Sequence, residues 1–276
     1  MVKKAAIIGL NYTSVPGLTL SGCIQDALNL QQFLIEKQGF ELANIRLLTD
    51  DTPTVPTRAN ILAALNWLVS GAKAGDSLWF SYSGHGSNQR DSLSKRKDET
   101  DALDETIVPL DYKTAGQIID DDLRDIVDSV PAGVRITWIS DSCHSASIVD
   151  LPYGYEDASI CRKRPQPKTY VSDDWATKTT TSKFKQYKDT AADILVISGC
   201  RDNSVSSDSW EDGKPCGAMT YSLLKSLRNA EKSGKSVISV QRLLKDMSCL
   251  LRCKGYTQKP NFSSGKQMSL DAEFTI

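Results

Sequence analysis

The chain has 276 residues, which is enough for one large α/β domain with a sizeable hydrophobic core. Its 33 Lys and Arg nearly balance its 34 Asp and Glu, and the net charge of -1 argues against a general nucleic-acid binder. The first apolar run is too brief for a signal peptide, no stretch is apolar for long enough to span a bilayer, and seven scattered Cys indicate free thiols, so we expect a cytoplasmic protein that binds no membrane.

Short apolar runs alternate with helical patterns along the chain, which predicts a mostly parallel sheet with helices on its faces. In the first part of the chain, the patterns predict a strand at 4–10, a helix at 22–38, a strand at 45–48, a helix capped by Thr57 and a strand at 78–82. In the rest of the chain they predict a helix at 120–130, strands at 135–140 and 194–198, helices near 218–229 and 239–251, and a last strand at 267–270. The buried face of the first helix is predicted to hold Ile24, Ala27, Leu28, Leu34 and Ile35.

The segment 151–190 interrupts this alternation because it is rich in Pro, Lys, Thr, Asp and Ser and poor in apolar residues. We interpret it as a linker loop within a single catalytic domain that covers residues 1–276. The linker then divides a larger part, 1–150, from a smaller part, 191–276. An acidic stretch at 87–104 predicts a second, shorter loop.

Two predicted strands end in polar residues that suit a nucleophilic mechanism. One runs into Ser83-Gly84-His85-Gly86, and the other runs into Asp141-Ser142-Cys143-His144-Ser145. Sites of open α/β sheets gather at the carboxyl ends of strands, so His85 and Cys143 would face each other if these strands are neighbours. An imidazole can take the thiol proton and later protonate the leaving amine. Main-chain N–H groups of Gly86 and Cys143 are expected to stabilise the oxyanion.

Each of these residues has a plainer interpretation when it is taken alone. A Cys after a strand is commonly a small buried hydrophobe, and a His there is commonly structural or exposed. The two together, at strand ends flanked by Gly, Ser and Asp, favour catalysis. His144 is a competing base, but adjacent residues of an extended chain point to opposite sides, which favours His85.

The motifs around His85 and Cys143 closely resemble the histidine and cysteine motifs of metacaspases, in the caspase-like peptidase clan. Further blocks of that family have counterparts in this chain at 22–27, 104–111, 119–123, 197–203, 217–221, 258–260 and 263–265. The resemblance covers nearly the whole chain, and the order and spacing of the blocks make it specific. Because the chain starts directly at its first predicted strand, it resembles a metacaspase that lacks an N-terminal prodomain.

The resemblance implies an α/β, caspase-like three-layer fold with a central, mostly parallel sheet of about six strands flanked by helices. It also implies a monomeric cysteine endopeptidase that cuts peptide or protein substrates after Arg or Lys. In the family pattern, Asp26 and Asp141 help to form the acidic specificity pocket, and Cys23 and Ser83 line it. A basic side chain that leaves water needs such anionic partners. Without the resemblance, Asp26 would be interpreted as a solvated helix residue and Asp141 as a strand-end cap.

Calcium activation is also implied by the resemblance, with Asp104, Asp120, Asp121 and Asp150 as ligands. Calcium takes several oxygen ligands, and clustered carboxylates repel one another until a cation arrives. The alternative is a solvated acidic face, which is how most charge runs behave. No organic cofactor is expected, and with only two His and no CxxC pair we expect no zinc site.

The linker holds Arg162-Lys163-Arg164 and several further Lys, so an enzyme that cuts after basic residues could cut itself there. Two other functions stay open: a caspase-clan peptidase that needs no calcium, and a catalytically silent scaffold that binds partners. Scaffolds of this kind usually lose the Cys or the His, and both are present here. The remaining thiols are assigned to structure, at Cys161, Cys200, Cys216, Cys249 and Cys253.

Overall fold

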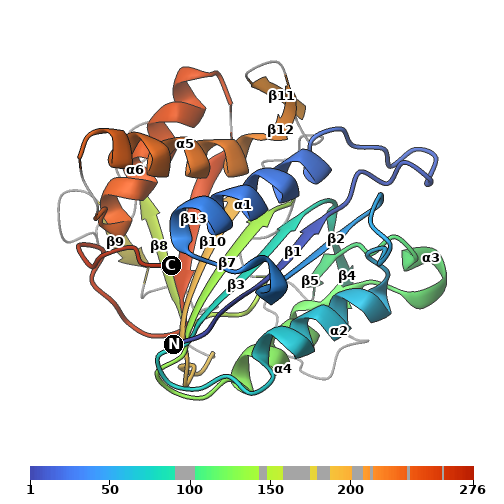
Figure 1. The fold of residues 1–276 in the computed structure, drawn as a ribbon, viewed down its shortest axis with the longest axis horizontal. Helices are drawn as coiled ribbons and strands as arrows, with labels where there is room; N and C mark the ends of the chain where they lie inside the picture. Colours follow the sequence, from blue (N-terminus) through green and yellow to red (C-terminus); the bar gives the residue numbers. More distant parts are fainter. Residues whose placement is uncertain are drawn as a thin grey trace.

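The structure, a computed structural model, describes residues 1–90, 103–142, 148–157, 175–178, 187–200, 208–211, 214–234, 237–256 and 258–276. Within these ranges the central sheet consists of β1 (Lys3–Gly9), β2 (Ile45–Thr49), β3 (Ser77–Ser83), β7 (Arg135–Asp141), β8 (Tyr153–Asp157), β9 (Trp175–Lys178), β10 (Asp193–Cys200) and β13 (Lys259–Ser264). The strand order is β2-β1-β3-β7-β10-β13-β8-β9 (Figure 1). The first five strands in this order run parallel, and each of the last three is antiparallel to its neighbour.

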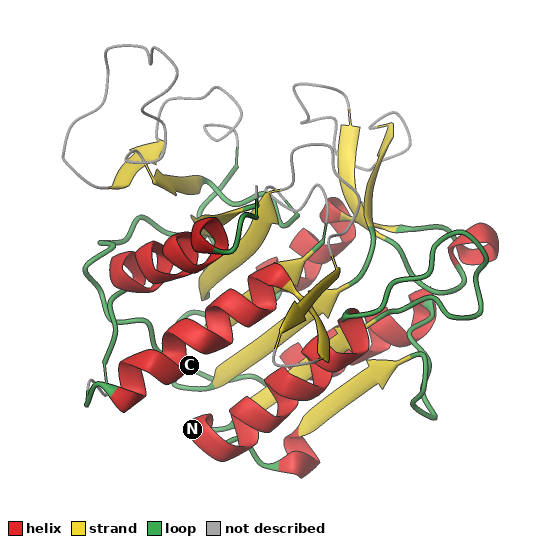
Figure 2. Ribbon diagram, turned by 90° about the horizontal axis from the view of Figure 1, so that it is seen from above, coloured by secondary structure: helices red, strands yellow, loops and turns green. Residues whose placement is uncertain are grey.

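Helices cover both faces of this sheet and give a three-layer arrangement (Figure 2). The helices of one layer are α1 (Cys23–Gln38), α5 (Ala218–Lys232) and α6 (Val240–Cys253), and those of the other are α2 (Arg58–Val69) and α4 (Asp120–Asp128). Shorter elements lie outside the layers: η1 (Leu42–Asn44), α3 (Tyr112–Ala115), a small sheet of β4 (Gly86–Arg90), β5 (Leu103–Ile107) and β6 (Ile118–Ile119), and the hairpin of β11 (Asp208–Glu211) and β12 (Lys214–Gly217). None of the helices in the described part of the chain has the length and apolar character needed to cross a bilayer.

The alternation of side chains along each strand explains why the sheet has a hydrophobic core on each of its two faces. Successive side chains of a strand point to opposite faces, so Ala5 and Ile7 of β1 join the core under α1, while Ala6 and Ile8 join the core under α2. All four residues are buried. Because both faces are covered, such a strand has an unbroken apolar sequence instead of an alternating one.

The topology also fixes where a site can form. In the sheet, β1 and β3 are neighbours. After β1 the chain passes through α1 to β2, which lies on the far side of β1, and after β3 it continues to β7, which lies on the far side of β3. The connections therefore diverge at the carboxyl ends of β1 and β3, which is the switch point where open α/β sheets bind their ligands.

The predicted α/β class and caspase-like layering are confirmed. The sheet has eight strands in the described residues where about six were expected, because β8 and β9 lie inside the segment 151–190 that was predicted to be a loop. Similarly, β4 and β5 occupy parts of the predicted loop 87–104. The division of the chain into larger part, linker and smaller part stays a prediction.

Two local predictions were wrong. Residues 267–270 form no strand, and the last strand is Lys259–Ser264, which contains Pro260, a residue that is unusual inside a sheet. On α1, Leu28 and Ile35 are exposed, because the buried face is rotated toward Cys23, Asp26, Ala27, Leu30, Phe33 and Leu34. The Thr57 cap is confirmed, since its hydroxyl accepts the Asn60 N–H.

Candidate active site

His85 lies at the switch point, two residues after β3 ends at Ser83. Its Nε2 is 2.8 Å from the Leu18 carbonyl oxygen, in the loop that follows β1. A carbonyl oxygen only accepts, so Nε2 carries the proton, and Nδ1 is the basic nitrogen of the neutral ring. The fold thus presents Nδ1 as the proton acceptor. Leu18 could not be found from the sequence, because a main-chain carbonyl has no residue signature.

Two tyrosines fix the backbone of His85. Tyr12 packs its ring against the imidazole, with the ring centroids 4.8 Å apart, and its hydroxyl accepts the His85 N–H at 3.1 Å. The Tyr82 hydroxyl donates to the His85 carbonyl at 2.7 Å. Burial, with the neighbouring Tyr82, raises the pKa of Tyr12 well above its usual value, so the Tyr12 hydroxyl stays protonated. Tyr82 is buried in the core.

The amide of Gly86 is oriented by the small sheet. Val108 N–H donates to the His85 carbonyl, and Gly86 pairs with Ile107 in the antiparallel β4–β5 ladder. This pattern makes Gly86 and Ile107 a non-hydrogen-bonded pair, so the Gly86 N–H points away from β5. The Gly86 N–H follows the imidazole-bearing residue directly and is not used in the β4–β5 ladder, which suits its expected role in stabilising the oxyanion.

The predicted nucleophile, Cys143, lies outside the described residues, as does His144. The strand that leads to it is described: β7 pairs in parallel with β3, and Asp141 stands opposite Ser83. The condition set by the sequence, that the two motif-bearing strands are neighbours, is therefore met.

The predicted specificity acids meet at the end of β7 that leads to Cys143. Asp26 and Asp141 are 1% and 4% exposed. Both oxygens of Asp26 accept the Gly217 N–H at 2.9 Å, while Asp141 Oδ2 accepts the N–H of Thr220 at 3.0 Å and its hydroxyl at 3.2 Å. A Cβ at Gly217 would collide with both carboxylates, so the two lie side by side.

The N-terminus of α5 is what brings these two acids together. Gly217 caps this helix and Thr220 lies in its first turn, where unpaired N–H groups and the helix dipole favour negative charge. Neither residue was singled out for the pocket from the sequence, although both fall in a block that resembles the family. Ser83 and Cys23 are buried at the ends of β3 and α1, as a pocket wall requires.

A second group of carboxylates lies on α4 and after β7. Ligand oxygens of Asp120, Asp121 and Asp150 lie within 4.8 Å of one another, and all three residues are buried. Burial, followed by repulsion from Asp150 and Glu105, raises the pKa of Asp120 to about 10. Asp104 is also buried, on β5, but it is not one of this group of three. Glu105 links it to the group, since its N–H donates to Asp120 at 2.7 Å.

This chemistry fits a hard cation better than it fits the solvated acidic face considered from the sequence. Several buried carboxylates offer the oxygen ligands that calcium prefers, and their mutual repulsion is relieved by positive charge. The residues present therefore suit the implied metal, with Asp120, Asp121 and Asp150 as the core of the ligand set and Asp104 adjacent to it.

Arg124 connects this group to two distant segments. It is buried on α4 and donates to the Asp150 carbonyl, to the Lys188 carbonyl at 2.6 Å and to Asp128 at 2.8 Å. Asp150 has φ 47°, a conformation that non-glycine residues rarely adopt, and Arg124 holds its carbonyl in place. Sequence reasoning did not find Arg124, because its main-chain partners lie 26 and 64 residues away.

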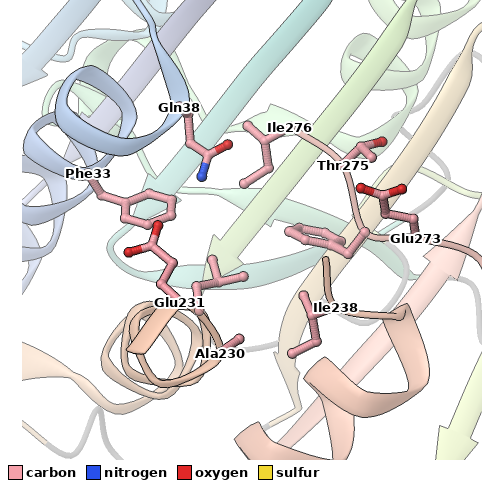
Figure 3. Close-up of a pocket in the computed structure, with 10 residues that line it drawn as sticks. Phe33, Gln38, Ala230, Glu231, Ile238, Glu273, Thr275 and Ile276 are labelled. Carbon is pink, nitrogen blue, oxygen red and sulfur yellow. The ribbon is translucent and has the colours of Figure 1, made fainter. Parts of the chain in front are cut away.

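A cavity of about 220 Å³ lies elsewhere in the molecule (Figure 3). Phe33 and Gln38 of α1, Ala230 and Glu231 of α5 and the segment 273–276 line it. These residues lie toward the C-terminal ends of α1 and α5, whereas Asp26 is in the first turn of α1 and Asp141 contacts the N-terminus of α5. Along α1 the rise is about 10 Å from Asp26 to Phe33 and about 18 Å to Gln38, and neither Asp26 nor Asp141 lines the cavity, so it is no part of the site.

Known proteins resemble this chain over nearly its whole length. The family described as "Metacaspase, peptidase C14 domain" matches residues 3–152. Metacaspase-1 of Cryptococcus neoformans is 38% identical over 305 aligned positions that take in 99% of this chain, and Metacaspase-1 of Scheffersomyces stipitis is 35% identical over a similar span. The chain spans 64% of the length of the first relative and 73% of the second.

Solved structures agree with this relationship. Protein GSU0716 from Geobacter sulfurreducens is 26% identical, with a TM-score of 0.63 over 98% of this chain and 95% of its own. Caspase-1 from Spodoptera frugiperda, 12% identical with a TM-score of 0.50 over 95% of this chain and 85% of its own, shares the fold. From the family match, the two relatives and the fold, we conclude that this chain belongs to the metacaspase family of caspase-like cysteine peptidases.

Proposed function

We propose that this chain is a cysteine endopeptidase that cuts after Arg or Lys, with Cys143 as nucleophile and His85 as general base. The observation that carries the proposal is the fixed orientation of His85, whose Nε2 is held by the Leu18 carbonyl at 2.8 Å. This leaves Nδ1 as the basic atom at the end of the strand that neighbours the one leading to Cys143.

The proposed reaction has two stages. His85 Nδ1 takes the thiol proton, the Cys143 thiolate adds to the peptide carbonyl carbon, and the N–H groups of Gly86 and Cys143 stabilise the oxyanion. The carbon–nitrogen bond then breaks as the imidazolium protonates the leaving amine, which leaves a thioester. In the second stage, water attacks the thioester while His85 takes its proton, and the thiolate leaves as the new carboxyl group forms.

Specificity for a basic residue before the cut is proposed from Asp26 and Asp141. Both are buried, and the N-terminus of α5 holds them side by side. A guanidinium or ammonium group entering this pocket would exchange its water for two carboxylates. An acidic side chain would instead meet two like charges, so we propose that cleavage after Asp is excluded.

Calcium activation is proposed from the buried acids. Calcium, when bound, supplies the positive charge that offsets the repulsion among Asp120, Asp121 and Asp150, with Asp104 beside them. Asp150 follows the segment that contains Cys143, and Arg124 fixes its carbonyl. We therefore propose that the ligand group orders this segment when its charge is balanced. Self-cleavage is proposed at the basic residues 162–164, which lie outside the described residues.

Hydrolysis of fluorogenic peptides ending in Arg, Lys or Asp tests the proposal. Wild type with calcium is expected to cleave the Arg and Lys peptides and not the Asp peptide. Cys143→Ala is expected to lose this activity, because it lacks the nucleophile. Folded wild type that is inactive on every peptide, with and without calcium, would support the silent scaffold instead. On gels of the same samples, linker fragments that form in wild type and not in Cys143→Ala would reveal self-cleavage.

Asp120→Asn is expected to abolish stabilisation by calcium. At a calcium concentration 100 times Kd, binding adds about 2.7 kcal/mol to the free energy of unfolding. The pKa of Asp120 is raised to about 10 on folding, so at neutral pH the calcium-free protein must take up a proton at Asp120 as it folds, which lowers its free energy of unfolding, and Asn removes that cost. Melting temperatures measured with calcium and with chelator check this.

The matched control is Asp125→Asn, since Asp125 lies on the same helix but is exposed and outside the carboxylate group. It should keep the calcium-dependent rise in melting temperature that Asp120→Asn loses. An equal rise in all three proteins would place calcium elsewhere.

A further inference from the structure

Cys249 and Cys253 form an exposed thiol pair on α6. Their Sγ atoms are 3.8 Å apart. The opposite side of the helix, with Leu243, Leu244 and Met247, is buried in the core, which leaves the thiol-bearing side to solvent. Both were assigned to structure from the sequence, and both are exposed. Cys23 and Cys216, in contrast, are buried.

The geometry of the pair suits a disulfide bond. Residues four apart in a helix have Cα atoms about 6 Å apart, inside the range of about 4.4 to 6.8 Å that disulfides span. The Sγ atoms must approach from 3.8 Å to about 2.05 Å. Cys253 is the last residue of α6, and Gly255 follows with φ 81°, so the chain turns away directly after the pair. The last turn of a helix adjusts more readily than its middle.

The two thiols are also chemically distinct. The hydrogen bond and charge interaction with Cys249 raise the pKa of Cys253. Cys253 then keeps its proton more readily than an ordinary thiol, which suits the resolving position and leaves Cys249 for the attacking one. A thiolate with a protonated thiol one turn away is the arrangement of an attacking and a resolving cysteine.

We propose that Cys249 and Cys253 are a redox-active dithiol that peroxides convert reversibly to an intrahelical disulfide. The Cys249 thiolate attacks one peroxide oxygen, the oxygen–oxygen bond breaks, and a sulfenic acid and hydroxide form. The Cys253 thiol then attacks the sulfenic sulfur, forms the sulfur–sulfur bond and releases water. In total, two thiols are oxidised and one hydrogen peroxide is reduced to two water molecules. An external thiol reverses the change by exchange.

Peptide mapping tests this in the full chain carrying Cys143→Ala, which removes the catalytic thiol and prevents self-cleavage. Reduced protein is treated with graded hydrogen peroxide, its remaining thiols are blocked with a maleimide, and it is digested with trypsin without reduction. Trypsin cuts after Arg252, between the two Cys, so their peptides stay joined only through a disulfide. The expected result is a joined species, two hydrogen atoms lighter than the separate peptides together, which dithiothreitol removes.

Cys249→Ser and Cys253→Ser are matched variants at exposed positions, and each should lose the joined species completely. In the Cys143→Ala chain, Cys23 and Cys216 should remain reduced at peroxide concentrations that oxidise Cys249 and Cys253 to the disulfide. Their thiols should therefore still react with the maleimide once the protein is denatured. The proposal is overturned if Cys249 and Cys253 remain alkylated as separate peptides while other thiols oxidise. It is also overturned if Cys249 reaches sulfinic acid with no joined species. The assay is independent of peptidase activity, so its failure leaves the proposed function untouched.

Discussion

His85→Ala is expected to lower kcat/KM for an Arg-ending peptide by about 1,000-fold or more, the range that loss of a general base produces. The variant loses the acceptor for the Cys143 proton and the donor to the leaving amine. The fold should survive, because Tyr12 and Tyr82 hold this loop mainly through main-chain atoms of residue 85. Steady-state kinetics, with circular dichroism as the check on folding, measure the effect.

His144→Ala is the natural control, since the chain has only two His. It is expected to keep most of the activity, because the base is assigned to His85. If the two variants show the reverse pattern, His144 is the base and the assignment is wrong. The rate at which an electrophilic peptide labels Cys143 gives a second measurement, which should fall in His85→Ala at neutral pH because less thiolate forms.

Asp141→Asn is expected to remove most of the preference for Arg. Removing one carboxylate from a buried, hydrogen-bonded charge contact costs about 2 to 5 kcal/mol, or roughly 30-fold to several thousand-fold in kcat/KM. Asn has nearly the same shape, and its oxygen can still accept the Thr220 N–H that now binds Asp141. The change is therefore mainly one of charge.

Citrulline provides the matched substrate, because it has the shape of Arg without its charge. Wild type should strongly prefer Arg to citrulline, and in Asp141→Asn the ratio of the two kcat/KM values should fall toward one. Asp193→Asn, at an exposed carboxylate on β10, is the control variant and should leave this ratio unchanged. An unaltered ratio in Asp141→Asn would move the specificity pocket elsewhere.

The sequence predicted the fold well where local signals were strong. The His85 and Cys143 motifs follow long apolar strands, and parallel neighbours place such strand ends at one edge. The sequence could not reveal the Leu18 carbonyl or the Gly217 N–H, since any residue supplies these groups and only the fold brings them to the site.

The errors have a similar origin. The polar segment that contains β8 and β9 was predicted to be a loop because it is poor in apolar residues, whereas in the sheet these strands extend one edge, with β8 paired to β13 and β9 paired to β8. The buried face of α1 includes Asp26, a charged residue that sequence patterns place in solvent. Its burial makes sense only once Gly217 is seen to donate to it.

The order of strands in the sheet determines what a cut in the linker would do. β8, which precedes residues 158–174, pairs with β13, and β10, which follows them, pairs with β7. Strands from the two sides of such a cut are thus interleaved, and Arg124 donates to carbonyls on both sides, at Asp150 and Lys188. After such a cut the two fragments would stay associated, because their strands belong to one sheet. Processing could then cut the chain, but it could not release a subunit.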